Sequence, residues 1–305
     1  MSDRAPTEEP PFVVVVNGAA GGGRCRSRFD RAYAELTELG LPMEVHFTEG
    51  PGHARELAQE HWTQGARRFL SVGGDGTLFE VLDGLLAVCG EERPVLGVLP
   101  LGTGNSFLRD FGIGDEREAL LALARGRRRR CDAIALRHQR GIHHFVNIFA
   151  VGFAAEAGEL TNRRFKSLGA AGYALAVAAT VARLGYQVDP VRVDGGELDV
   201  GPRTFLAVCN SRFTGGKMMM APRARPDDGL LDVVRCGPMR RGELLAAFPR
   251  IFRGTHLELP QIDYAQGERV EFEQPREQPV MLDGEVLRLA PCELRVRPGC
   301  WEVIA

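Results

Sequence analysis

A glycine-rich turn, Ser71–Thr77 (SVGGDGT), constrains the fold of this chain more than any other stretch. The apolar run Arg68–Val72 before it predicts a short buried strand, and the apolar residues after it recur at helical spacing: Leu78, Val81, Leu82, Leu85 and Leu86. Glycine lets the backbone approach an anion closely, and the first turn of a helix presents unpaired N–H groups and a positive dipole end. The order strand, glycine turn, helix therefore predicts a phosphate-binding site.

A single carboxylate, Asp75, lies within this turn. An acid next to a bound phosphate is unfavourable unless a cation or a proton-transfer task compensates its charge. Asp75 therefore indicates Mg²⁺ handling or activation of a hydroxyl group. The motif alone leaves open the alternative of an ordinary strand-to-helix turn in which Asp75 caps the helix.

The composition favours two globular domains. A chain of 305 residues is long for a single core, and its 44% hydrophobic and 26% charged residues are typical of soluble proteins. The net charge of −2 excludes a general attraction to nucleic acid. The seven cysteines show no C-x-x-C pair, and residues 1–11 lack the pattern of a signal peptide. We therefore expect reduced thiols, a flexible N-terminus and a cytoplasmic location.

The first part of the chain alternates predicted strands with predicted helices. Two more glycine loops follow strands, residues 17–23 after Phe12–Val16 and residues 100–105 after Pro94–Leu99. Such alternation predicts parallel βαβ units, whose ligands bind where the strands end. We therefore expect an α/β domain over residues 12–132, with helices on both faces of the sheet and all three loops at strand ends.

The second part of the chain, residues 133–305, is typical of a mainly antiparallel β domain. Its predicted strands are short and separated by turns: His143–Val151, Val188–Val193, Thr204–Cys209, Leu230–Arg235, Arg269–Phe272, Val280–Leu282 and Leu294–Val296. Two predicted helices interrupt these strands, Leu168–Leu184 and Met239–Phe252. The first contains the longest apolar stretch of the chain, which is too short to span a bilayer.

Several motifs occur in the order of a known kinase family. The first two are Gly73–Thr77 followed by Leu78, Glu80 and Val81, and Pro100–Phe107 (PLGTGNSF). The later ones are Val151–Glu156, Gly215–Met218, Ala221–Ala224, Asp227–Asp232 and Leu282–Glu285. Over roughly residues 12 to 304 the chain resembles the diacylglycerol kinase catalytic-domain family, in its bacterial form related to sphingosine kinases. It departs from the usual pattern at Gly18, where proline is common, and at Ser106, where many members have aspartate.

The resemblance implies an ATP-dependent lipid kinase. Its N-terminal three-layer α/β domain would be similar to that of phosphofructokinases and NAD kinases, and its C-terminal domain would be a β-sandwich with helical insertions. With Mg²⁺, the enzyme would transfer the γ-phosphate to a lipid hydroxyl, with diacylglycerol as the favoured acceptor. The implied nucleotide site consists of Asn17, Thr48, Gly73, Gly74, Asp75, Gly76, Thr77, Gly102, Thr103, Gly104 and Asn105. Thr48 could equally be a strand-end threonine, and Asn105 could be a helix cap.

The resemblance also implies a catalytic base near the acceptor hydroxyl. Asp283 is the first candidate, Glu285 is the competing one, and Asp75 would assist through Mg²⁺ or a water network. We expect Asp283 and Asp75 to be solvated, so that removing their charge leaves the fold intact. The residues alone favour a different role for Asp283–Gly284, because Asp–Gly is a common hairpin turn.

The stretch Asp227–Leu230 resembles a metal-binding turn of the same family. The carboxylate of Asp228 and the main-chain carbonyls of Arg225 and Leu230 would hold a Mg²⁺ ion away from the transferred phosphate. A plain β-turn is the alternative.

The remaining expectations concern partners and rival functions. The five arginines of Arg125–Arg130 could attract an anionic membrane surface, although a solvated helix end explains them as well. Leu168–Leu184 could line an acyl-chain pocket or belong to the core. We expect ATP and a lipid as partners, transient membrane contact and no nucleic acid, and we leave a homodimer open. The rival functions are a sphingoid-base or other lipid kinase, an NAD kinase, and a silent lipid- or nucleotide-binding regulator.

Overall fold

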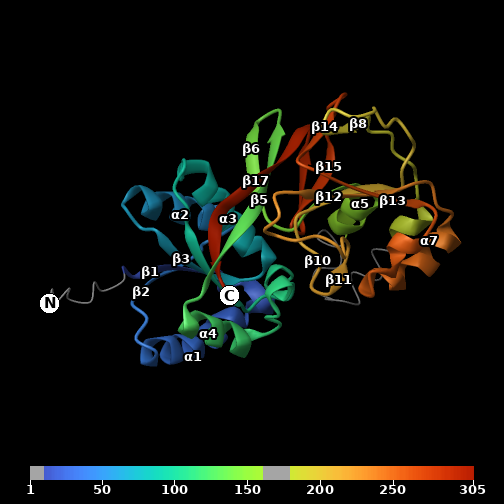
Figure 1. Ribbon diagram of the computed structural model, residues 1–305. Helices are drawn as coiled ribbons and strands as arrows, with labels where there is room; N and C mark the ends of the chain where they lie inside the picture. Colours follow the sequence, from blue (N-terminus) through green and yellow to red (C-terminus); the bar gives the residue numbers. More distant parts are fainter. Residues whose placement is uncertain (1–9, 161–178) are drawn as a thin grey trace. The chain divides into compact units, whose positions relative to one another are not determined.

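The computed structural model describes residues 10–160 and 179–305 (Figure 1). The chain forms two compact units: unit 1 consists of Met1–Gly102, Gly114–Arg129 and Trp301–Ala305, and unit 2 consists of Thr103–Ile113 and Arg130–Cys300. The predicted division at residue 132 lies close to the point where the chain passes from unit 1 to unit 2, after Arg129. The prediction did not include the return of the C-terminal residues to unit 1 or the membership of Thr103–Ile113 in unit 2.

Unit 1 is built on a parallel sheet, as predicted. Its strands lie in the order β2 (Met43–Phe47), β1 (Phe12–Val16), β3 (Arg68–Gly73) and β4 (Val95–Pro100). β4 also pairs in parallel with Glu302 and Val303 at the end of the last strand, β17 (Pro291–Ile304). Every residue of β1 is buried, as expected for a parallel strand that is covered on both faces.

Four helices cover this sheet: α1 (Cys25–Glu38), α2 (His53–Thr63), α3 (Asp75–Val88) and α4 (Glu116–Arg125), with a short 3-10 turn, η1 (Ala20–Gly23), before α1. Figure 1 shows α2 and α3 together on one face and α1 and α4 on the other. The ends of α4 are set by local signals in its own sequence. The Asp115 side chain accepts a hydrogen bond from the Glu118 N–H at 2.9 Å, and Gly126 takes a left-handed φ of 61° after the last turn.

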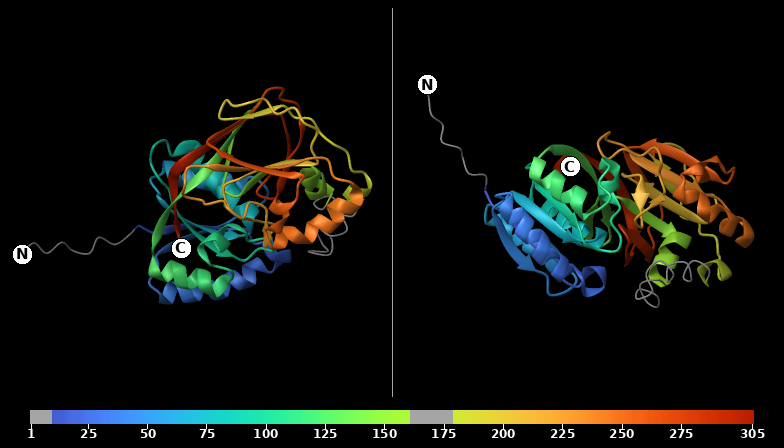
Figure 2. Two further views of the ribbon diagram at one scale, coloured as in Figure 1. Left: turned by 45° about the vertical axis from the view of Figure 1, so that its right-hand side comes forward. Right: turned by 90° about the horizontal axis from the view of Figure 1, so that it is seen from below.

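Unit 2 contains an antiparallel β-sandwich, which confirms the predicted fold class of this part (Figure 2). One sheet has the order β13 (Ile262–Gly267), β12 (Leu231–Cys236), β9 (Phe205–Cys209), β7 (Ile148–Gly152), β15 (Gln278–Leu282) and β16 (Glu285–Leu289). The other includes β5 (Arg128–His138), β6 (Gly141–Phe145), β8 (Val191–Val193), β14 (Arg269–Phe272) and the first part of β17. The rings of Phe149 in β7 and Phe272 in β14 pack edge to face at 5.7 Å, so the two sheets share a core.

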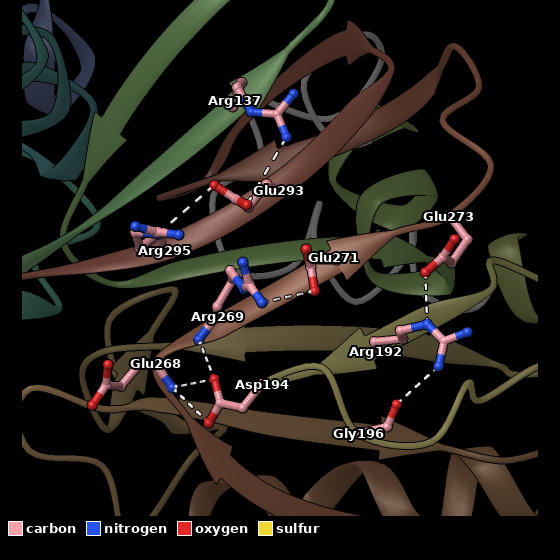
Figure 3. A network of polar contacts seen from close by, with 10 residues as sticks. All are labelled: Arg137, Arg192, Asp194, Gly196, Glu268, Arg269, Glu271, Glu273, Glu293 and Arg295. Atoms are coloured by element: carbon pink, nitrogen blue, oxygen red, sulfur yellow. Dashed lines mark hydrogen bonds and ion pairs between the residues drawn. The ribbon is translucent and has the colours of Figure 1, made fainter.

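The outer face of the β14 sheet is charged (Figure 3). Val270 and Phe272 are buried, whereas Arg269, Glu271 and Glu273 alternate with them on the other face. Arg269 pairs with Glu271 at 3.3 Å, and further pairs lie along the neighbouring strands. Each exposed pair contributes little free energy, so the alternation itself, rather than the ion pairs, fixes which face of β14 is buried.

Short helices accompany the six-stranded sheet. They are η2 (Phe107–Phe111), α5 (Phe153–Leu160), α7 (Arg241–Ala247), η5 (Phe248–Phe252) and η6 (Thr255–Glu258), and a small hairpin is formed by β10 (Phe213–Thr214) and β11 (Met218–Met219). The helix predicted over Met239–Phe252 is therefore confirmed, although it changes from α to 3-10 geometry beside Pro249, which has no N–H to donate. Residues 1–9 of the predicted flexible N-terminus and residues 168–178 of the predicted helix Leu168–Leu184 lie outside the described residues.

Within residues 10–160 and 179–305, no helix is both long enough and apolar enough to cross a bilayer.

A buried histidine in η6 contributes to the pH dependence of the stability of unit 2. His256 lies with Nε2 2.9 Å from the main-chain oxygen of Met220, and its Nδ1 is buried without a hydrogen-bond partner among the described residues. Burial lowers the pKa of His256 below its ordinary value of 6.5, against the opposing effect of the hydrogen bond to Met220. Folding therefore favours the neutral ring over the protonated ring.

We expect the contribution of His256 to the free energy of unfolding to be complete above pH 6.5 and to be lost as the pH falls below it, because only the unfolded state then gains the proton. His256→Gln keeps a donor for Met220 but does not titrate, so it should flatten this loss. Urea unfolding of both proteins between about pH 8 and pH 5 measures the effect, with His53→Gln as the control. Parallel pH profiles for wild type and His256→Gln would contradict the assignment.

Candidate active site

Two of the predicted glycine loops touch through their backbones at one edge of the unit 1 sheet. β3 and β4 are parallel neighbours, so the turns that follow them meet. The Gly102 N–H donates to the Gly73 carbonyl at 2.7 Å. A Cβ added to Gly102 would lie 2.5 Å from the Gly74 Cα, which no side chain tolerates. Glycine is therefore required here for close approach of two main chains.

The first glycine loop joins the same group. The Asn17 N–H donates to the Val72 carbonyl at 2.9 Å, and the Asn17 side-chain amide donates to the Thr77 hydroxyl at 3.3 Å. Gly21 has φ 62°, and a Cβ there would lie 2.7 Å from the Leu101 carbonyl oxygen. The predicted residues Asn17, Thr77 and Gly102 are thus brought together although they come from three separate loops.

Asp75 begins helix α3 at this edge. The N-cap position is Gly74, whose carbonyl accepts from the Thr77 and Leu78 N–H groups at 3.0 and 3.2 Å. Asp75 is therefore the first helical residue and not the N-cap, which removes the capping alternative. Its side chain is half-buried at the positive end of the helix dipole, where a carboxylate and a bound anion both gain from the N-terminal N–H groups.

Thr48 lies one strand further along the same edge. It follows β2, and its N–H donates to the Val16 carbonyl at 2.9 Å, directly before Asn17. The structure therefore gives Thr48 the strand-end position that its pattern predicts, beside the first glycine loop.

The remaining residues of the third loop, Thr103, Gly104 and Asn105, belong to unit 2. The N-cap of η2 is Ser106, so Asn105 is not the helix cap. Ser106 is buried, and its hydroxyl accepts from the Gly216 N–H at 2.9 Å. The residue that departs from the family pattern thus holds together two of the family motifs, Pro100–Phe107 and Gly215–Met218.

Asp283 forms a hairpin turn with Gly284 and is buried, with 5% of its surface exposed. Both residues have positive φ, 50° and 95°, as the Asp–Gly signal predicts. The Asp283 carboxylate accepts three main-chain hydrogen bonds, from Val146 at 3.0 Å, Asn147 at 2.8 Å and Ile148 at 2.9 Å. The expectation that Asp283 is solvated is therefore wrong, whereas Glu285, two residues later, is exposed.

A polar network that the sequence did not indicate extends from this turn. The Asn210 amide donates to the carbonyls of Asp132 and Val146, both at 3.2 Å. The Ser211 hydroxyl donates to Asn147 Oδ1 at 2.8 Å. Asn210 and Ser211 directly follow a predicted strand, a position that is often functional, but their partners are distant in the sequence and could not be found without the fold.

The turn predicted to bind metal is ordered by two carboxylates. Asp228 Oδ1 accepts from the Leu230 N–H at 3.0 Å, and Asp132 Oδ2 accepts from the Gly229 N–H at 2.7 Å. Asp132 was not a candidate from the sequence. Arg225 reaches Asp227 at 3.4 Å, so its side chain is turned to an exposed acid.

The electrostatics of this turn favour a cation. Burial raises the pKa of Asp132, with further increases from Asp228 and Asp227. Burial and then Asp228 raise the pKa of Asp232 to about 7. Asp232 Oδ2 is buried and has no hydrogen-bond partner among the described residues. A hard cation with oxygen ligands would relieve this repulsion, so the residues fit Mg²⁺.

Comparison with known proteins agrees with this geometry. The model described as the diacylglycerol kinase catalytic domain matches residues 11–136, and the model described as the YegS C-terminal NAD kinase beta sandwich-like domain matches residues 147–305. A Mycobacterium tuberculosis protein named diacylglycerol kinase is 29% identical over 96% of this chain and 94% of its own length. A Chromohalobacter salexigens protein named "Probable lipid kinase YegS-like" is 33% identical over 83% of this chain and 81% of its own length.

A solved structure from Bacillus anthracis shares the fold, with a TM-score of 0.79, 23% identity and coverage of 100% of this chain and 98% of that chain. The chain belongs to the diacylglycerol kinase catalytic-domain family in its YegS-like form, and it is a kinase.

We predict that Gly102→Ala weakens ATP binding about tenfold or more, because its Cβ would force Gly74 and the first turn of α3 away from the loop. Isothermal titration with ATP measures the affinity. Gly50→Ala is the matched control, since an added Cβ there meets no atom within 4 Å. Equal ATP affinity in Gly102→Ala and wild type would contradict the role of this backbone contact.

Proposed function

We propose that this kinase transfers the γ-phosphoryl group of ATP to the hydroxyl of diacylglycerol and releases phosphatidic acid. The observation that carries the proposal is the meeting of Asn17, Thr77 and Gly102 with the N-terminus of α3, which concentrates main-chain donors where a phosphate chain would bind. The relatives named diacylglycerol kinase and YegS-like lipid kinase support a lipid acceptor.

In this proposal unit 1 holds the nucleotide. Main-chain N–H groups within Gly73–Thr77, at the start of α3, donate to phosphate oxygens, and the hydroxyl of Thr77 adds a further donor. Thr48 and Asn17 lie at the same edge of the sheet and complete the proposed nucleotide site. The half-exposed carboxylate of Asp75 would hold Mg²⁺, which neutralises developing charge on the phosphate oxygens when bound.

We assign the catalytic base to Glu285 and a positioning role to Asp283. A base must reach the acceptor hydroxyl and accept its proton. The Asp283 carboxylate is buried and accepts three main-chain hydrogen bonds, so both of its oxygens are already engaged. Glu285 is exposed on the strand that leaves the same turn. Asp283 thus fixes the turn that presents Glu285.

Measurements of stability and of turnover distinguish the roles of Asp283 and Glu285. Glu285→Gln should lower kcat by about 10²–10⁴-fold with the melting temperature unchanged. Asp283→Asn should lower turnover and also cost about 1–3 kcal/mol of unfolding free energy, because an amide cannot accept all three hydrogen bonds. Glu197→Gln, another exposed glutamate of unit 2, is the control. Normal turnover in Glu285→Gln, together with a normal melting temperature and lost turnover in Asp283→Asn, would instead make Asp283 the base.

The acceptor is tested with labelled ATP, diacylglycerol, sphingosine and NAD, with Asp75→Ala as the inactive control. Label in diacylglycerol that depends on Asp75 is the expected result. Label in another lipid alone would mean that this lipid, and not diacylglycerol, is the acceptor. Label in NAD alone would mean that the enzyme is an NAD kinase. ATP binding without transfer to any acceptor would favour the silent regulator.

We also propose that Asp228 and the carbonyls of Arg225 and Leu230 hold a structural Mg²⁺ ion. Asp232, with its buried unmatched oxygen, and Asp132 supply the negative field around it.

Mg²⁺ at about 100 times its Kd should then stabilise the protein by about 2.7 kcal/mol. Asp228→Ala should abolish this increment, and Asp263→Ala, an exposed aspartate paired with Arg235, should keep it. Thermal unfolding with and without Mg²⁺ measures both. If Mg²⁺ stabilises Asp228→Ala as much as it stabilises the wild type, the proposed Mg²⁺ site is ruled out.

A further inference from the structure

The segment formed by α7 and η5 has one face in the core and one face in solvent. Leu244 is buried in the core of unit 2, and Phe248 and Ile251 pack against the same core. On the same segment Leu245 is 50% exposed and Phe252 is 48% exposed. Figures 1 and 2 show α7 at the outer rim of unit 2. Two large apolar side chains therefore face solvent on an element that is otherwise well packed.

These exposed residues recur on one side of the segment. Leu245, Pro249 and Phe252 follow one another at four and then three positions, which is the spacing of one helical face, and all three are exposed. The Phe248 and Phe252 rings pack edge to face at 5.9 Å, so Phe252 is held in place by the partly buried ring beneath it. The contact with Phe248, which packs against the core, therefore holds Phe252 of this apolar stripe in its exposed position.

Positive charge surrounds this stripe. Arg240, Arg250 and Arg253 are exposed, and none of them forms an ion pair with another residue in the described part of the chain. Arg241 is used differently, since its guanidinium donates to the carbonyls of Val181 and Ala182 at 3.1 and 3.2 Å. Glu243 is the acidic residue of this segment, and its carboxylate accepts a hydrogen bond from the Arg240 main-chain N–H at 2.7 Å.

We propose that this surface, which we call the α7 face (Leu245, Pro249, Phe252, Arg240, Arg250 and Arg253), docks the enzyme on an anionic lipid bilayer. Arginines beside exposed apolar side chains match a bilayer surface, where phosphate groups lie above acyl chains. The proposal rests on the proposed function, because a lipid acceptor with long chains resides in a membrane. It places membrane contact on a different segment from Arg125–Arg130.

The α7 face is coupled to the strand that carries the proposed base. Phe248 and Ile251 pack on the same core as Met281 of β15, which leads directly into Asp283. Docking therefore orients the β15–β16 turn with respect to the membrane through one packed core, within unit 2 alone.

The test is cosedimentation with vesicles of phosphatidylcholine, with and without phosphatidylglycerol. Wild type should bind the mixed vesicles more tightly, and Leu245→Ser with Phe252→Ser should weaken this binding about tenfold or more. Leu39→Ser with Leu121→Ser is the matched control, because these side chains are 50% and 48% exposed in unit 1. Arg250→Gln with Arg253→Gln should weaken binding about 25-fold on mixed vesicles only, and Arg31→Gln with Arg117→Gln should not.

Wild-type affinity in both α7-face variants would overturn the proposal. So would a fall in oligomeric mass on ultracentrifugation with vesicle binding unchanged, because the face would then join two copies of the chain. Turnover of a short-chain, water-soluble diacylglycerol should be equal in all variants. Vesicle binding that depends on the α7 face, without phosphorylation of any lipid, would retain this surface and reject the proposed function.

Discussion

The hydrogen bond from Gly102 to the Gly73 carbonyl is the interaction on which the candidate nucleotide site depends. It joins the turns after two adjacent parallel strands, and it forms only because Gly102 carries no side chain, whose Cβ would lie 2.5 Å from the Gly74 Cα. The same contact sets the position of Gly74, which is the N-cap of α3. The helix N-terminus, the Asp75 carboxylate and the Asn17–Thr77 hydrogen bond follow from that position. A small change in one glycine would therefore move every proposed phosphate donor of unit 1.

In unit 2 a buried carboxylate holds a hairpin turn in place. Asp283 has the left-handed φ of a hairpin turn and also gathers three main-chain N–H groups. Asp194 has the same φ of 50° and accepts from the Glu268 and Arg269 N–H groups, but it lies on the exposed face drawn in Figure 3. Two Asp–Gly turns of one chain thus make similar hydrogen bonds at different depths. Asp283 is buried, whereas Asp194 is exposed.

Local patterns predicted much of this structure because the interactions concerned are local. The α4 helix begins after Asp115 and ends before Gly126, and each of these residues acts within one helical turn. The strands before the glycine loops follow from short continuous apolar runs, and the antiparallel strands of unit 2 follow from short alternating segments separated by turns. The sequence also indicated which loops would meet, because parallel strands end at one edge.

The rest depends on contacts between residues far apart in the chain. Nothing near Asp132 or Asn210 in the sequence signals that Asp132 holds Gly229 or that Asn210 joins Val146. The burial of Asp283 is likewise a property of its partners at residues 146–148 and not of its own motif. Thr103–Ile113 belongs to unit 2 and Trp301–Ala305 belongs to unit 1. Tertiary packing decides this division, and strand and helix patterns in the sequence do not encode it.

Hydrogen–deuterium exchange on addition of ATP and Mg²⁺ tests the central claim most directly. If the glycine loops of unit 1 form one phosphate site, amides of residues 17–23, 73–77 and 101–102 should all gain protection at the same ATP concentration, and Gly102→Ala should reduce the gain in all three. Protection confined to one loop, or located away from this edge of the sheet, would contradict the account.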